Sequence, residues 1–384
     1  MCDIVNCTLS LPIGKSWTDP STVQYSAIIK PQAPIYDFSS LLYDEEENSL
    51  YSFGGEESYL ETKNLDLAVW KLQPNGGGGG TWTRNTSYGS LPFTQGITRP
   101  FGGASTFTKS TGFYLGGYSS SHSSPQTQNL NNFVPLPGLV ECNFNDWTWS
   151  NSSAGITALS QTGSFEWGGL EYVPFGPNGL LVMWGGETSN NSIYFPGVES
   201  RPMNTVTLLD PVTKQWYIQN VTGTAPSPRN RFCSIIATDP RPLSTANSMG
   251  TSEIFMYGGY AGILGAGAEQ YDEVWMLSIP AFTWLRVDGS QKSARIGHTC
   301  HLVGGRQLLS IGGADAAQTD PWSTPDYSNI NGIGVFDLVT NAWKGGYNAS
   351  AAPYHRSRLV QDYYDQKWVG ISSPLLLLIY TTEC

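Results

Sequence analysis

The four histidines are the first residues whose side chains could bind a metal or move a proton: His122, His298, His301 and His355. His298 and His301 lie three residues apart in a β-rich run. Side chains alternate between the two faces of a strand, so these two imidazoles point to opposite faces and cannot easily chelate one ion. We therefore expect structural histidines, with His298 hydrogen-bonded to a neighbouring loop, and no metal site.

The six cysteines contain no CxxC pair, a pattern that does not indicate a thiolate zinc site. They are Cys2, Cys7, Cys142, Cys233, Cys300 and Cys384. Cys233 and Cys300 each follow an arginine by four or five residues, at equivalent places in consecutive repeats. Such strands could be too far apart for a disulfide, which needs Cα atoms within about 7 Å. The sequence favours two buried free thiols here, and leaves open a pairing of Cys2 or Cys7 within the N-terminal segment.

Sequence motifs for hydrolysis are missing, because neither G-x-S-x-G nor HExxH occurs. Carboxylates are frequent, and a facing pair could serve a glycosidase, but the sequence selects no pair. Asp210, Asp272 and Asp337 adjoin expected strands, where aspartate usually closes a turn. We predict no catalytic residue, no cofactor and no metal ligand.

The 13 Trp and 20 Tyr residues invite a carbohydrate-binding interpretation, because their ring faces can stack on sugars. Most of them occupy repeated positions that belong to a core. Tyr118, Tyr260 and Tyr347 follow glycine doublets near loops, so they are the better candidates for an exposed binding face.

The sequence pattern that contains most of these residues recurs five times along the chain. A β-rich run ends in a glycine doublet, an alternating strand follows, and a tryptophan closes the unit. The doublets recur every 54 to 73 residues, and the tryptophan follows 26 to 31 residues later. The five units contain Gly54, Gly55 and Trp82; Gly116, Gly117 and Trp147; Gly185, Gly186 and Trp216; Gly258, Gly259 and Trp284; and Gly312, Gly313 and Trp343. Each unit predicts one four-stranded antiparallel sheet, and several such sheets bury their faces by packing radially.

Composition agrees with an all-β chain of many short strands. Of 384 residues, 40% are hydrophobic and only 13% are charged, and Gly (43) and Pro (24) are plentiful. The formal net charge of −11 and the scattered Lys and Arg argue against nucleic-acid binding and against an anionic membrane surface. The longest apolar run, 374–380, is far shorter than the ~20 residues that span a bilayer.

The repeated unit resembles the kelch repeat. The stretch Ala294–Gly313, ARIGHTCHLVGGRQLLSIGG, is similar to the kelch-propeller proteins of filamentous fungi, and the resemblance extends from about residue 5 to about residue 370. It implies a kelch-type β-propeller of the galactose-oxidase-like superfamily. The copper-radical oxidases of that superfamily hold the metal with two imidazoles and two tyrosines, and the spacing of His298 and His301 implies a relative without the copper site.

The two ends of the chain predict a sixth blade. Residues 7–11 and 15–17 have the pattern of a third and a fourth strand without their doublet strand, a half-blade over 5–20. Residues 358–364 have the pattern of one more strand, which would close this blade. We therefore expect one propeller over 1–370 with six blades, or alternatively seven, and a short tail over 371–384. A second interpretation places a signal peptide and the missing strand upstream of Met1.

Six N-x-S/T sequons favour a glycosylated protein of the secretory route, extracellular or at the cell surface, with a cytoplasmic location as the alternative. The sequons begin at Asn6, Asn85, Asn151, Asn190, Asn220 and Asn348. For function, we expect a non-enzymatic binding module for a protein or glycan partner. The alternatives are an extracellular oxidase, or a glycan-acting hydrolase or isomerase, with a site at the channel mouth, and an intracellular kelch scaffold.

Overall fold

The computed structural model of the chain forms two compact units, which are considered separately. It describes residues 7–30, 33, 35–58, 65, 68–85, 97–152, 159–160, 163–189, 198–243, 250–287, 294–318 and 332–367. The first unit comprises Met1–Pro12, Gln24–Leu170 and Glu187–Glu199. The second comprises Ile13–Val23, Glu171–Gly186 and Ser200–Cys384.

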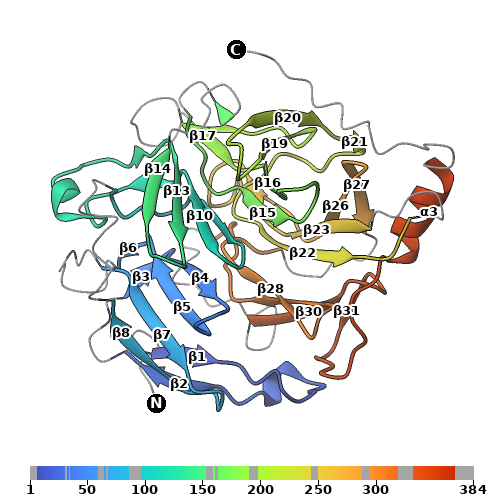
Figure 1. The fold of residues 1–384 in the computed structure, drawn as a ribbon, viewed down its shortest axis with the longest axis horizontal. Coiled ribbons are helices and arrows are strands. Elements are labelled where there is room, and N and C mark those ends of the chain that lie inside the picture. Colours follow the sequence, from blue (N-terminus) through green and yellow to red (C-terminus); the bar gives the residue numbers. More distant parts are fainter. Residues whose placement is uncertain are drawn as a thin grey trace. The chain divides into compact units, whose positions relative to one another are not determined.

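The first unit contains two four-stranded antiparallel blades (Figure 1). The first blade consists of β4 (Ser40–Asp44), β5 (Ser49–Phe53), β7 (Trp70–Pro74) and β8 (Gly80–Arg84). The second consists of β9 (Ala104–Phe107), β10 (Thr111–Leu115), β13 (Leu139–Asn143) and β14 (Trp149–Ser152). A separate two-stranded sheet pairs β1 (Cys7–Ser10) with β2 (Ser26–Ile29).

Three further blades belong to the second unit, apart from the first two residues of β15. The third blade consists of β15 (Gly169–Val173), β16 (Leu180–Trp184), β19 (Thr205–Leu209) and β20 (Trp216–Asn220). The fourth consists of β22 (Cys233–Asp239), β23 (Thr251–Tyr257), β26 (Val274–Ile279) and β27 (Thr283–Val287), with β21 (Thr222–Gly223) parallel to β27. The fifth consists of β28 (Thr299–Val303), β29 (Gln307–Ile311), β30 (Ile333–Asp337) and β31 (Ala342–Lys344). The all-β propeller fold is confirmed, but the described residues form five blades rather than six or seven.

A short two-stranded ribbon follows the glycine doublet in each of the first four blades. The ribbons pair β6 (Glu56–Glu57) with β3 (Tyr36–Asp37), β11 (Tyr118–Ser119) with β12 (Val134–Pro135), β17 (Glu187–Ser189) with β18 (Val198–Ser200), and β24 (Tyr260–Ala261) with β25 (Glu269–Gln270). Two 3₁₀ turns, Pro20–Thr22 and Pro125–Thr127, complete the short elements. Tyr118 and Tyr260, two of the three tyrosines predicted to be exposed, lie within these ribbons and are buried.

The doublets join neighbouring blades, because each second glycine donates its N–H to a carbonyl that precedes the next blade. The four bonds join Gly55 to Pro100, Gly117 to Phe165, Gly186 to Arg229 and Gly259 to Arg295, with N···O distances of 2.7 to 2.9 Å. At Gly259, φ is +89° and a Cβ would lie 2.8 Å from the carbonyl oxygen of Asn230. A side chain at this position would therefore be strained and would also clash with the segment that leads into β22 of the same blade.

We call the interface between two neighbouring blades of one unit a seam, and apolar side chains fill the three seams that follow. The seam of the first and second blades contains Leu42, Tyr51, Phe53, Tyr114, Val140, Cys142 and Trp147. The seam of the third and fourth blades contains Val182, Trp184, Met203, Val206, Ile254, Met256 and Trp284. The seam of the fourth and fifth blades contains Cys233, Phe255, Tyr257, Met276, Leu308 and Phe336, and it also holds Val360 and Tyr364 from the C-terminal helix.

The predicted sixth blade is not found among the described residues. β1 pairs with β2 instead of with residues 15–17, which contribute only an isolated bridge from Trp17 to Tyr347. The predicted closing strand over 358–364 is wrong, because this segment belongs to the helix α3 (Arg358–Lys367). The expectation of one propeller domain over 1–370 stays a prediction, and the tail over 371–384 lies outside the described residues.

α3 shows why the strand prediction failed. Val360 and Tyr364 are its buried residues, and they are four apart, so they share one helix face. Arg358 and Asp362 form an ion pair of 2.6 Å at the same spacing on the exposed side. A short run with mixed apolar and polar residues fits either period, and packing against the fourth blade selected the helix. No helix among the described residues is long and apolar enough to cross a membrane.

Candidate functional site

A cavity of about 430 Å³ opens in the second unit where β22 and β28 meet the chain that leads into α3. Its volume is in the range of ligand-binding pockets. Ten residues line it: Ala237, Thr238, Asp239, Pro240, Arg241, Leu302, Gly305, Pro353, Tyr354 and His355. Three separate stretches of the chain therefore build one concave surface.

The lining combines an apolar surface with one exposed cation. Leu302 is 41% exposed although it is a leucine on a strand, and Pro240 and Pro353 extend this apolar surface. The side chain of Arg241 is 54% exposed and approaches the Asp239 carboxylate to 2.6 Å. Arg241 thus has N–H groups that can still bind a ligand, while the Asp239 carboxylate partly balances its positive charge.

Asp239 is the polar anchor of this surface. It is fully buried, and it accepts hydrogen bonds from the Arg241 guanidinium and from the main-chain N–H of Arg356, the latter at 2.9 Å. Burial alone would raise the pKa of Asp239, but the bonds from Arg241 and Arg356 outweigh it and lower the pKa to about 2. Arg356 also donates to the carbonyls of Arg241 and Pro242. These contacts fix the chain before α3 against the end of β22.

A second carboxyl group, Glu253 on β23, lies behind the cavity and is fully buried. It accepts hydrogen bonds from Tyr354 Oη at 2.8 Å and from Ser278 Oγ at 2.9 Å. Burial raises the pKa of Glu253 to about 7, although these hydrogen bonds act in the opposite direction. Tyr354 is only 8% exposed. Glu253 therefore orients Tyr354 and is itself sealed from the cavity.

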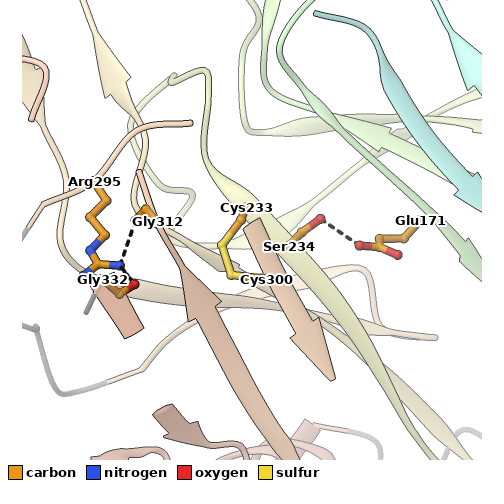
Figure 2. The surroundings of a disulfide bond; sticks show 7 residues. All are labelled: Glu171, Cys233, Ser234, Arg295, Cys300, Gly312 and Gly332. Atoms are coloured by element: carbon orange, nitrogen blue, oxygen red, sulfur yellow. Dashed lines mark hydrogen bonds between the residues drawn. A yellow bond between two sulfur atoms is a disulfide. The ribbon is translucent and has the colours of Figure 1, made fainter. Parts of the chain in front are cut away.

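The seam of the fourth and fifth blades also contains a disulfide between Cys233 and Cys300, with a Cα–Cα distance of 5.4 Å (Figure 2). The expectation of two free thiols is therefore wrong. Cys233 pairs with Tyr257, one residue before its doublet, whereas Cys300 pairs with Ser310, two residues before its doublet. The two cysteines thus differ by one position along equivalent strands, so their side chains point to opposite faces and meet across the seam.

Beside the disulfide, the neighbouring position on β22 contacts the third blade (Figure 2). Ser234 Oγ donates to Glu171 Oε1 at 2.8 Å. Burial raises the pKa of Glu171 to about 7, against the effect of this hydrogen bond. Cys7 is also disulfide-bonded, and Cys142 is a buried free thiol.

His298 precedes β28 and is 4% exposed. Its ring contacts the Tyr257 ring with a centroid distance of 5.0 Å and approaches Gly258 of the neighbouring blade. Burial, together with the charge of Arg295, lowers the pKa of His298 to about 3, while the nearby main chain of Tyr257 acts in the opposite direction. Neither ring nitrogen makes a hydrogen bond of good geometry within the described part of the chain. The hydrogen bond expected for His298 is therefore not found.

Comparison with known proteins gives the family of this architecture. Residues 177–371, about half of the chain, match the KLHDC2/KLHL20/DRC7 Kelch-repeats domain. The chain belongs to the kelch-repeat family. A protein of Arthroderma benhamiae named Kelch repeat-containing protein is 30% identical over 203 residues. These residues are 51% of this chain and 26% of that relative, so the chain aligns with about a quarter of the relative's length.

The kelch glycine doublets directly follow β5, β10, β16, β23 and β29. The five kelch tryptophans are less uniform. Trp284 and Trp147 are buried, whereas Trp82, Trp216 and Trp343 are only partly buried. Trp147 also lies in the turn before β14 rather than in a strand. The wedge between kelch blades is therefore filled by tryptophan in some seams and by other side chains in the rest.

Two further groups of sequence predictions concern the three tyrosines and the sequons. Tyr118, Tyr260 and Tyr347 are at most 5% exposed, so the prediction that they form an exposed face is wrong. Among the sequons, Asn151, Asn220 and Asn348 are exposed, Asn85 is partly buried, and Asn6 and Asn190 lie outside the described residues.

Asp210 and Asp337 accept N–H groups of the turns that follow their strands, as their positions predicted. No sequence motif indicated the cavity. A carboxylate inside the apolar run EIFMY, at Glu253, was the one local signal that a buried polar contact was needed there.

Proposed function

We propose that this kelch protein is a non-enzymatic binding module, and that the cavity at the ends of β22 and β28 receives a segment of a protein partner. The cavity carries this proposal, because exposed apolar surface and an exposed cation meet there in one concave site. The segment would insert an apolar side chain beside Leu302 and place an acidic group near Arg241.

A protein segment fits this lining better than a glycan does. Sugar rings stack on exposed aromatic faces, but Tyr354 is 8% exposed and points its hydroxyl inward to Glu253. The exposed surface is aliphatic, from Leu302, Pro240 and Pro353. Aliphatic pockets suit the side chains of a peptide.

The carboxyl groups around the cavity support binding over catalysis. A general acid or base must reach the substrate within hydrogen-bond distance. Asp239 is held by two arginines, and Glu253 is fully buried behind Tyr354. Neither group is arranged to act on a ligand in the cavity.

We also propose that the protein works outside the cell or at its surface. Two cysteines form a disulfide that closes a separation of 67 residues, and such bonds persist in oxidising compartments. Asn151, Asn220 and Asn348 are sequon positions with exposed side chains. Peptide mass spectrometry of protein made in a fungal host tests this proposal: occupied sequons support it, and bare sequons with reduced Cys233 and Cys300 contradict it.

The binding function is tested by affinity capture of partners from the secreted proteins of the source organism, followed by measured affinities with the purified partner. Leu302→Asp and Arg241→Glu should each weaken binding by tenfold or more, a loss of about 1.4 kcal/mol. Ile263→Asp is the matched control, because Ile263 is 75% exposed in the same unit and does not line the cavity. Unchanged affinity in both cavity variants, with the fold intact, would overturn the proposal.

A further inference from the structure

The disulfide and His298 form a cluster that the binding function does not use. One ligand atom from each of Cys233, His298 and Cys300 lies within 4.8 Å of the others. All three belong to the seam of the fourth and fifth blades. We propose that, once the Cys233–Cys300 disulfide is reduced, the two thiolates and the His298 imidazole bind one thiophilic metal ion.

His298 is the residue on which the proposal depends. Burial of an imidazole without a hydrogen-bond partner costs desolvation free energy, and a bond to a metal ion would offset that cost. The residue is 4% exposed, and among the described residues neither of its ring nitrogens has a partner. A neutral imidazole is the form that coordinates metals.

The cysteines provide the softer part of the site. Two thiolates and one imidazole match the preferences of Cu⁺ and Zn²⁺. Cys300 is only partly buried, whereas Cys233 and His298 are buried, so an ion or a reductant can approach from the Cys300 side. The sulfurs must separate to accept an ion at about 2.3 Å from each, and rotation of the two side chains can provide this movement.

The surrounding charge favours Cu⁺. Two thiolates and Cu⁺ leave a net charge of −1, and the positive charge of Arg295 acts on the same site. Buried charges need such compensation. Zn²⁺ would need a fourth ligand in addition to the two thiolates and the imidazole.

The reaction balances in two steps. Two equivalents of an external thiol give up their hydrogens to Cys233 and Cys300 and are oxidised to their own disulfide. Cu⁺ then displaces one proton from each cysteine thiol and keeps its oxidation state. Metal binding and the disulfide therefore exclude each other.

The test uses the full chain, reduced with a dithiol, freed of reductant without oxygen, and titrated with Cu⁺ against a chromophoric Cu⁺ chelator. Because the dithiol also opens the disulfide of Cys7, we expect one more Cu⁺ per reduced wild-type chain than per equally reduced Cys233→Ser, Cys300→Ser chain, and none at this site in the oxidised chain. His298→Gln should weaken Cu⁺ binding by more than about tenfold, because even the outer partners of a metal site contribute that much. X-ray absorption should show sulfur and nitrogen ligands.

Two further variants keep the test decisive if His298→Gln unfolds. Cys142→Ser removes a buried thiol outside the site and should leave Cu⁺ binding unchanged, whereas Cys233→Ser with Cys300→Ser should remove the one Cu⁺ bound at this site. Circular dichroism reports whether each variant is folded. Equal Cu⁺ binding by the reduced wild type and the folded double variant would overturn the proposal, and tighter binding of Zn²⁺ than of Cu⁺ would overturn the choice of ion.

Discussion

Two seams can be compared, that of the first and second blades and that of the fourth and fifth blades. Both contain a hydrogen bond from the second glycine of a doublet to a carbonyl before the next blade, but different side chains fill them. The bond from Gly55 to Pro100 is 2.7 Å long, and the bond from Gly259 to Arg295 is 2.8 Å long. The first seam is then filled without a covalent link, for example by Phe53 against Tyr114, whose ring centroids are 5.5 Å apart. The second adds a disulfide and a buried imidazole.

This difference shows that the doublets set the spacing of the blades, while the side chains in a seam are free to vary. Glycine at these positions brings two backbones together, and any filling of suitable volume then completes the packing. A seam can thus hold a disulfide-bonded cysteine pair without a change of fold. The predictions below test how far the two seams are separate.

The largest effect is expected from removing the disulfide. Replacing both Cys233 and Cys300 by Ser should lower the free energy of unfolding by about 4 kcal/mol, because the bond closes a loop of 67 residues. Hydrogen exchange should rise in β22 and β28 and stay unchanged in β5 and β10. Equal increases in both places would show that the seams unfold as one.

The doublets should respond alike in the two seams. Gly259→Ala and Gly55→Ala should each cost about 3 kcal/mol, from the positive φ and from the clash of the new Cβ with a carbonyl. Gly267→Ala is the control, because a Cβ there meets nothing within 4 Å. Chemical denaturation measures all three, and a tolerated substitution in one doublet would contradict a shared role.

Glu253 gives the second seam a pH dependence. Its pKa is about 7 in the folded protein, against 4.5 for an ordinary glutamate. The folded state therefore binds the proton more tightly, so the stability from this group is complete below pH 4.5 and is lost as the pH rises through 7.

Between pH 5 and pH 8, the free energy of unfolding of the wild type should fall by an amount on the order of 2 kcal/mol because of this group, and Glu253→Gln should not show this fall. The measurement is the denaturation midpoint of wild type and variant at both pH values. Because Glu171 changes in the same direction in both proteins, the difference between them isolates Glu253. Parallel pH curves for the two proteins would contradict the assignment.

The smallest effect belongs to the edge of the first seam, where Lys71 Nζ approaches Glu47 Oε2 to 2.6 Å. Both side chains are partly exposed to solvent, and such pairs contribute little. Lys71→Ala should change the free energy of unfolding by about 0.5 kcal/mol, and added salt should reduce the difference. A loss as large as that of Gly55→Ala would show that this ion pair helps to hold the blades.

The functional part of the molecule was less predictable than its repeats. The cavity depends on Leu302, Arg241 and Tyr354, which are far apart in sequence and carry no motif. Cys233 and Cys300 were visible, but their pairing depended on a one-residue offset between two strands. The spacings from Arg229 and Arg295, four and five residues, already differ by this one residue, but only the strand register shows that the two side chains meet across the seam.

The sequence by itself determined the blades, because a glycine doublet after a β-rich run is a local requirement of backbone conformation. Five doublets gave five blades, each with its doublet at the end of the second strand. Only the tertiary structure decided what the chain ends do. The segment 358–364 could satisfy its backbone hydrogen bonds as a strand or as a helix, and burial of Val360 and Tyr364 against the fourth blade chose the helix. Local rules fix conformation where one residue type fits, and long-range packing decides where several conformations fit equally well.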